Sequence, residues 1–228
     1  RIFMCHKDKR DLKGTNALQY IEWGEQQEKK ITQGKNKGSV IKGFHNISSV
    51  QGRKRWYDLG KRSIPPIVLP CSYRKDFLVY KNPSVLVDKR LYELYSAKSS
   101  DSFSINLNSI LYPLFLEILT RSYGGGGGPI DATVEEIEQV YIVTPDAIEI
   151  PAKILNEKRK VKTIFKESGI NPESDTPISE QDPQPLPDRA ELDNIVFDAL
   201  GLTDEERKEV YRAVCQLVWN RICKARSV

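Results

Sequence analysis

Residues 29–62 form a strongly basic run, with ten Lys and Arg against a single acid, Asp58. Three aromatic residues interrupt this run: Phe44, Trp56 and Tyr57. An apolar stretch, residues 64–69, follows it. A basic tail that only stays in solution repels itself, remains extended and has no use for such side chains. We therefore expect a folded basic face, of the kind that meets a polyanion carrying groups that can stack.

The charge is distributed unevenly along the chain, which the formal net charge of +4 conceals. Residues 1–90 carry 20 basic and 8 acidic side chains, whereas residues 91–228 carry 15 basic and 23 acidic ones. This asymmetry predicts that the first half contacts nucleic acid and the second stays solvated. An acidic membrane surface would suit the same charge. However, no segment approaches the roughly 20 apolar residues that span a bilayer, and no basic amphipathic helix is evident. We therefore expect no membrane partner.

Length and cysteine content favour an ordinary globular protein. The 228 residues, 39% of them apolar, suffice for one large domain or for a domain with a smaller appendage. The four cysteines are scattered, without a C-x-x-C motif and without metal-ligand spacing to either histidine, which indicates reduced thiols and no metal site. The chain opens on a strand-like segment with no targeting signal, so we expect a cytoplasmic location and a piece of something longer.

Hydrophobic periodicity and turn residues predict the elements of the first two thirds of the chain. We expect a strand at 2–6, a helix at 16–28, an exposed loop region at 34–52, and strands at 67–70, 77–80, 85–87 and 140–143. Residues 105–120 are apolar at helical spacing, and Pro113 within them implies either a kink or a helix that begins there. We expect one long buried helix. Five glycines follow it, at 124–128.

Residues 171–191 contain five prolines and six acids with almost no apolar content, the composition of an extended, solvated linker. Beyond it, residues 192–200 and 204–223 indicate a helical hairpin, because Gly201 ends the first helix and a capping box at Thr203 starts the second. The predicted fold class is therefore α+β: a domain of short antiparallel strands with one long helix over 1–170, an acidic linker over 171–191, and a hairpin over 192–228.

No catalytic constellation is evident. A Ser-His-Asp or Cys-His site would need His6 or His45, and neither stands beside a nucleophile on an activating turn. The zinc-protease, P-loop and dinucleotide-binding motifs are also missing. The glycine tract follows a helix, so it is either a floppy connector or a place where bare backbone approaches another backbone, DNA included.

The order of several short motifs nevertheless resembles a known family. These are Gly-Arg-Lys-Arg-Trp-Tyr-Asp-Leu at 52–59, Pro-Ile-Val at 66–68, Leu-Asn-Ser at 107–109 opening a helix, Arg121 with the glycine tract, and Val-Thr-Pro at 143–145. Together they resemble the target-recognition domain of adenine-specific DNA methyltransferases of prokaryotic restriction–modification systems, of the TaqI type and its fused restriction–methylation relatives. The similarity covers about residues 40–150, and the tail from Glu191 to Tyr211 is similar to the C-terminal end of archaeal and bacterial members.

The resemblance implies a division of labour. Members of the family hold the extruded adenine with an Asn-Pro-Pro-Tyr-type motif and bind S-adenosylmethionine on a glycine-bearing turn, but here Asn82-Pro83 continues as Ser84-Val85. The methyl-transfer domain would then precede Arg1 in the parent chain, which would use S-adenosylmethionine, whereas this chain has no cofactor or catalytic residue. The partner of this chain would be double-stranded DNA. The chain would bind the duplex and recognise the target sequence, and it would not catalyse the methyl transfer.

Matching residues become candidates for DNA contact. Arg53, Lys54 and Arg55 are assigned to phosphates or bases, with pairing to Asp58 or to a helix C-terminus as the alternative. Asn108 either reads an adenine or caps a helix, and core packing is favoured over base stacking for Trp56 and Tyr57. Arg62, in the basic run, is a further candidate. Arg74 and Lys75 either extend the basic face or are merely solvated. Arg121 is the candidate for reading a base, and Gly125 and Gly126 complete the set.

Two other functions fit the same sequence. A mixture of basic and aromatic side chains also suits an RNA-binding module that stacks unpaired bases. A protein-interaction domain built on the acidic segment and the helical hairpin is the third possibility.

Overall fold

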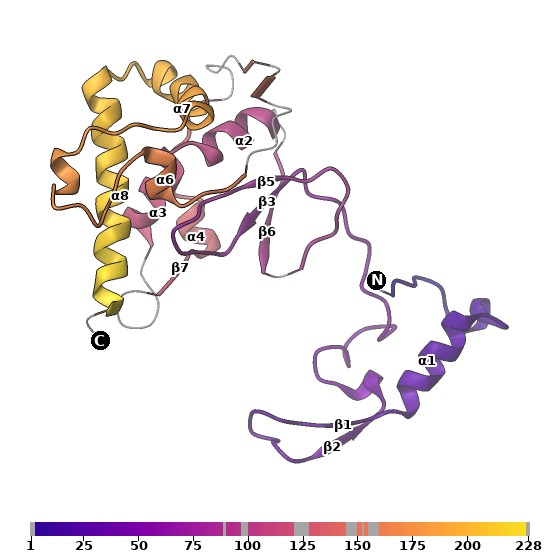
Figure 1. Ribbon diagram of the computed structural model, residues 1–228. Helices are drawn as coiled ribbons and strands as arrows, with labels where there is room; N and C mark the ends of the chain where they lie inside the picture. The colour runs from indigo at the N-terminus through magenta and orange to yellow at the C-terminus, as the bar shows by residue number, and fades with distance from the viewer. Residues whose placement is uncertain are drawn as a thin grey trace. The chain divides into compact units, whose positions relative to one another are not determined.

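The computed structural model describes residues 3–88, 90–96, 100–120, 128–144, 150–151, 153–154 and 160–226. The chain divides into two compact units, Arg1–Ser63 and Ile64–Val228, which we call the N-terminal and C-terminal units. Both contain helices and short antiparallel strands (Figure 1), so the predicted α+β class is confirmed. The division falls at Ser63 and not near residue 170, where the composition had placed it.

The N-terminal unit is built around α1 (Asn16–Gln26), close to the predicted helix. Thr15 caps it, since its Oγ1 accepts a hydrogen bond from the Leu18 amide at 3.3 Å. The antiparallel strands β1 (Glu28–Lys30) and β2 (Val40–Lys42) follow it in the chain and form a hairpin. One-turn helices η1 (Lys9–Leu12) and η2 (Phe44–Asn46) complete the unit, and its small core contains Cys5, Leu12, Ile21 and Tyr57.

Two predictions for this unit were wrong. Residues 3–6 pair with no strand. Cys5 packs into the small core and the Phe3 ring lies 4.8 Å from that of Tyr20, whereas Met4 and His6 are exposed. The region 34–52 is not all loop, since it contains β2 and η2.

The C-terminal unit holds two small antiparallel sheets. β3 (Ile67–Pro70) lies where predicted and is the central strand between β5 (Tyr80–Lys81) and β6 (Leu91–Leu94). Its first three residues are all buried, as expected for a continuous apolar run. The second sheet pairs β4 (Ser72–Tyr73) with β7 (Ile130–Asp131). A capping box at Thr133 then starts the short helix α4 (Val134–Ile137).

The strands predicted at 77–80, 85–87 and 140–143 do not form as such, and side-chain amides explain why. Asn108 accepts from the Val79 amide at 3.1 Å and donates to the Val79 carbonyl at 2.9 Å. The Asn106 side chain likewise accepts from the Val143 amide at 2.8 Å and donates to the Val143 carbonyl at 3.2 Å. Each amide replaces the backbone of a neighbouring strand. Asn82 likewise bonds both the amide and the carbonyl of Val85, which closes a turn.

The predicted single long helix is two helices. α2 (Ser100–Asn108) and α3 (Leu111–Leu119) meet at a bend of 69°. Pro113 lies in the first turn of α3, where a missing N–H costs no helical hydrogen bond. The Ile110 amide at the break donates instead to Asp193 Oδ1 at 2.8 Å. The second of the two expectations for Pro113, a helix that begins near it, is the correct one.

The segment predicted to be a solvated linker is anchored to the core at a few points, although most of its residues from 171 to 186 are exposed. Ile178, in η4 (Ile178–Glu180), is only 4% exposed and joins the main core. The Gln181 side chain accepts from the Asn171 amide at 2.9 Å and donates to its carbonyl at 2.8 Å. Just before this segment, α6 (Ile164–Ser168) ends at Gly169, whose φ of 66° and whose approach to the Gln184 carbonyl leave no room for a side chain.

The C-terminal hairpin is confirmed as α7 (Pro187–Leu200) and α8 (Asp204–Arg226), but α7 begins at Pro187, inside the segment predicted to be a linker. Gly201 ends α7 at a φ of 68°, and Thr203 and Glu206 exchange hydrogen bonds at the start of α8. α8 runs beside α3 and α6 (Figure 1) and buries Tyr211, Val214, Cys215 and Val218 in the main core. No helix in the described part of the chain is alone long and apolar enough to cross a bilayer; α2 and α3 meet that test only as a bent pair.

Candidate nucleic-acid interface

The two units differ in charge. The N-terminal unit carries 15 Lys and Arg against 6 Asp and Glu, a balance of +9, whereas the C-terminal unit carries 20 against 25. Within the predicted basic face every cation except Arg55 is exposed: Lys29, Lys30, Lys35, Lys37, Lys42, Arg53, Lys54, Lys61 and Arg62. Most of the positive charge is therefore available to an external anion.

Arg55 is the exception because it is locked inside the unit. Its Nε and Nη2 donate to Asp58 Oδ2 at 3.1 and 2.8 Å, and its Nη1 donates to Asp8 Oδ1 at 2.8 Å. This guanidinium, then the Gly60 amide and His6, hold the pKa of Asp58 well below its usual range. The alternative considered from the sequence, pairing with Asp58, is thus the one found for Arg55.

Its two neighbours in the motif remain at the surface. Arg53 donates from Nη1 to the Asp58 carbonyl at 3.3 Å, and Lys54 is exposed. The motif therefore offers two exposed cations and one that organises the loop.

Trp56 and Tyr57 are anchors of the small core, as favoured from the sequence. The Tyr57 ring is buried and its hydroxyl donates to the Lys7 carbonyl at 3.0 Å. The half-buried Trp56 donates from Nε1 to Glu25 Oε1 at 3.2 Å. Its indole lies against α1 at Gly24, where an added Cβ would come within 2.6 Å of the ring.

An aromatic hollow of about 710 Å³, which the sequence did not predict, opens beside Trp56. Its ring-bearing walls come from four segments and include Phe3, Tyr20, Phe44, Trp56 and Tyr57, with Lys29 and Arg53 also lining it. Ile21 is the buried apolar side chain of α1, whereas Tyr20 is exposed and carried no signal in the sequence. These rings are far apart in sequence and become neighbours only after folding.

In the C-terminal unit, Arg74 and Lys75 are exposed side chains on a turn whose backbone is fixed. The Arg74 carbonyl accepts from Arg221 Nη2 at 2.5 Å and the Lys75 carbonyl accepts from the Ile164 amide at 2.8 Å. Arg221 also donates to the Gly128 carbonyl at 2.9 Å and pairs with Glu117 at 2.6 Å, both side chains being at most 7% exposed. One buried guanidinium thus ties α8 to α3, to this turn and to the end of the glycine tract.

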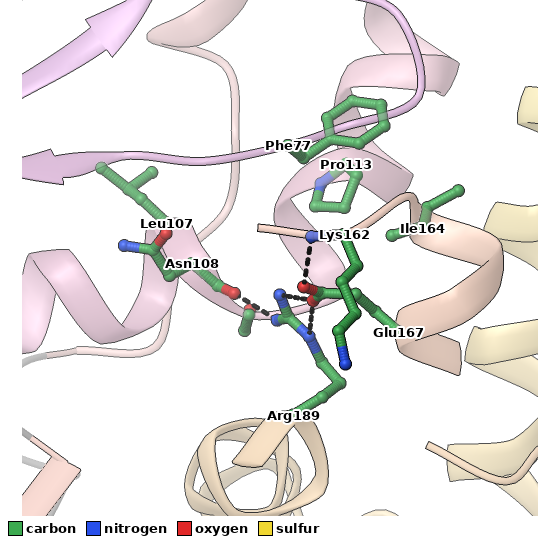
Figure 2. Close-up of a pocket in the computed structure, with 9 residues that line it drawn as sticks. Phe77, Leu107, Asn108, Pro113, Lys162, Ile164, Glu167 and Arg189 are labelled. Atoms are coloured by element: carbon green, nitrogen blue, oxygen red, sulfur yellow. Dashed lines mark hydrogen bonds and ion pairs between the residues drawn. The ribbon is translucent and has the colours of Figure 1, made fainter. Parts of the chain in front are cut away.

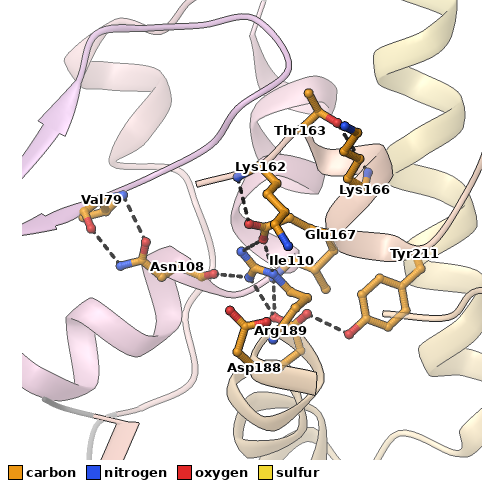
Figure 3. A network of polar contacts seen from close by, with 11 residues as sticks. Val79, Asn108, Ile110, Lys162, Thr163, Lys166, Glu167, Asp188, Arg189 and Tyr211 are labelled. Atoms are coloured by element: carbon orange, nitrogen blue, oxygen red, sulfur yellow. Dashed lines mark hydrogen bonds and ion pairs between the residues drawn. The ribbon is translucent and has the colours of Figure 1, made fainter. Parts of the chain in front are cut away.

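The half-buried Asn108 belongs to a polar network inside the C-terminal unit. Figure 3 shows its amide turned to Val79, while its carbonyl accepts from Arg189 Nη1 at 2.5 Å. Arg189 also donates to Glu167 Oε2 at 2.5 and 2.7 Å and to Asp193 Oδ1 at 3.3 Å. Asn108 lies at the end of α2 and caps no helix start, and its two side-chain N–H groups already donate to the Val79 and Ser104 carbonyls.

The same network lines a cavity of only about 10 Å³ (Figure 2). A space of that size holds at most one water molecule. The Asp193 carboxylate accepts from the Tyr211 hydroxyl at 2.7 Å, and desolvation raises its pKa above the usual value although Arg189 opposes the shift. The arrangement is that of a structural ion cluster.

The other candidate residues are placed only in part. Arg62 is exposed. Arg121, Gly125 and Gly126 lie outside the described residues, so their assignment to DNA stays a prediction. Across the described ranges no group of three or more His, Cys, Asp and Glu side chains is arranged to hold a metal ion, and all four cysteines are free.

Comparison with protein-family models, with curated proteins and with solved structures gave no match.

Proposed function

We propose that this chain is the duplex-DNA recognition module of an adenine-specific DNA methyltransferase. The observation that carries the proposal is the N-terminal unit, with its balance of +9 and its exposed cations on the β1–β2 hairpin and the 53–54 loop. Such a surface binds the phosphate backbone and positions a protein on DNA. The order of short motifs described above adds the methyltransferase context.

In this proposal the chain supplies binding and the parent enzyme supplies chemistry. A methyl-transfer domain on the same parent chain would bind S-adenosylmethionine and act on the adenine amino group, in the cytoplasm. The exposed Arg74 and Lys75 of the C-terminal unit are further candidates for contact with the same duplex.

The test removes two exposed cations from the basic motif. In Arg53→Ala/Lys54→Ala we expect weaker binding to every duplex sequence, and the salt slope should fall by about 1 for each phosphate that is no longer neutralised. The matched control is Lys160→Ala/Lys166→Ala, which removes two exposed lysines from the acidic C-terminal unit and should change neither quantity. Fluorescence anisotropy over a range of salt concentrations measures both.

Unchanged affinity and salt slope in the first variant, with its circular dichroism intact, would remove these residues from the DNA face and favour a protein-interaction domain.

The aromatic hollow favours one second candidate, an RNA-binding module. Rings that stack unpaired bases bind single strands without much regard to sequence. Competition between duplex DNA and single-stranded RNA separates the two functions, because the leading proposal requires the duplex to win at equal length.

A further inference from the structure

We infer that the aromatic hollow of the N-terminal unit is a binding site for one unstacked nucleotide of the bound DNA. This inference rests on the proposed function and adds to it a site at which a single base leaves the helical stack and lies against protein rings. Its support comes from the shape, the rigidity and the charge of the hollow.

The hollow has the size and lining of a small-ligand site. Its volume of about 710 Å³ falls within the range of roughly 300–1,000 Å³ that is usual for such sites. The rings around it form a continuous series: Phe3 to Tyr20 at 4.8 Å, Tyr20 to Trp56 at 6.5 Å, and Trp56 to Phe44 at 5.8 Å between centroids. A planar base stacks on such rings whatever its identity, because every base has a π-face.

Part of the wall is fixed and part is open. Trp56 is held by its hydrogen bond to Glu25 and by its packing on Gly24. Tyr20, in contrast, is 42% exposed although it lies in the middle of an aromatic cluster. A fixed indole beside an exposed phenol provides a preorganised surface for an incoming ring.

The charge selects a nucleotide over an uncharged apolar ligand. Lys29 and Arg53 line the aromatic hollow, and the acid that also lines it, Glu28, is paired with Lys42 at 3.6 Å. A second hollow of about 450 Å³, which is polar, shares Arg53 and Trp56 with the first and adds Lys54. The two acids that line this polar hollow are already paired within the unit, Asp8 with Arg55 and Glu25 with Lys9. A base in the aromatic hollow would therefore leave its phosphate beside Arg53 and Lys54.

The experiment compares two duplexes that differ only in one unpaired adenosine. The wild-type chain should bind the bulged duplex roughly 5-fold to 150-fold more tightly than the fully paired one, the range that corresponds to stacking of one base. Tyr20→Ala should abolish this preference without changing affinity for the paired duplex, and Tyr20→Phe, which keeps the ring, should retain it. Tyr80→Ala, which removes an exposed tyrosine from the C-terminal unit, is the matched control and should behave as wild type.

A second measurement does not depend on any variant. Stacking next to Trp56 should quench tryptophan fluorescence of the wild-type chain more strongly with the bulged duplex than with the paired one, at saturation of both.

The outcomes separate this inference from the proposed function. Equal affinity for both duplexes, with a normal salt slope, would overturn the nucleotide site and leave duplex binding intact. Equal weakening of both complexes by Tyr20→Ala would also overturn it, because Tyr20 would then act on the duplex or on the fold. Absence of salt-dependent binding to either duplex would overturn both proposals and leave the hollow to a protein segment.

Discussion

Replacing Arg189 by Met should destabilise the C-terminal unit severely. The guanidinium lies between two buried carboxylates, Glu167 and Asp193, and all three side chains are at most 6% exposed. The substitution keeps most of the volume but leaves both carboxylates without their shared cation and the Asn108 carbonyl without its donor.

Removing one partner from a buried ion pair costs about 3–5 kcal/mol, because an uncompensated charge stays behind. Here two charges stay behind, so we expect the destabilisation to lie at or above about 5 kcal/mol, a large part of the 5–15 kcal/mol typical of a whole domain. The destabilisation should shrink as the pH falls. Arg189 lowers the pKa of Asp193 against the larger effect of desolvation, so its removal raises that pKa further. A carboxyl whose folded-state pKa is raised favours folding at low pH, and this contribution disappears as the pH rises through the folded-state pKa.

Urea unfolding followed by far-ultraviolet circular dichroism measures the effect. Arg212→Met is the matched control, since Arg212 pairs with Glu205 and Glu209, whose side chains are 72% and 66% exposed and become solvated when the cation is removed. The control should cost no more than about 1 kcal/mol. A destabilisation of that size in Arg189→Met, independent of pH, would refute the view that Arg189 is the cation that neutralises this cluster.

Two further predictions concern the C-terminal unit. Arg221→Met should cost about 3–5 kcal/mol in the same assay, because it leaves Glu117 buried and charged and frees the Arg74 and Gly128 carbonyls; a cost below about 1 kcal/mol would contradict the geometry. Limited proteolysis under native conditions should leave residues 171–186 intact despite their composition, since Ile178 is buried and Gln181 is bonded to Asn171, and an early cut identified there by mass spectrometry would show that the packing does not persist.

Regular patterns in the sequence predicted the regular parts of the fold. The apolar run of β3 and the Gly201–Thr203 junction of the C-terminal hairpin are local signals, and each lies where it was expected. Local signals suffice there because the residues that satisfy the backbone are neighbours in sequence.

The strands predicted at 77–80 and 140–143 failed for the opposite reason. Their backbone partners are the side chains of Asn108 and Asn106, which lie 29 and 37 residues away along the chain. An apolar run predicts burial, and Phe77 and Val79 are indeed buried, but it does not state which group accepts the backbone hydrogen bonds. The linker prediction for 171–186 failed for a similar reason. The segment is polar in composition, but the burial of Ile178 and the hydrogen bond of Gln181 to Asn171 anchor it to the fold.

For the candidate DNA face, too, the sequence predicted composition but not contacts. The number of cations in the N-terminal unit can be counted from the sequence, but the fold decides which of them face an acid. Five of the six acids there are paired, Asp8 and Asp58 with Arg55, Glu25 with Lys9, Asp11 with Arg10 and Glu28 with Lys42.

These pairs locate the excess positive charge. Arg55, the central cation of the motif by composition, is neutralised twice over, whereas Lys54 and the lysines at 29, 30, 35 and 37 remain exposed. The hairpin β1–β2 and the 53–54 loop therefore carry positive charge that no acid of this unit balances, and a polyanion would be drawn to them. Since the 53–54 loop also borders the aromatic hollow, phosphate binding and base stacking would act on the same nucleotide.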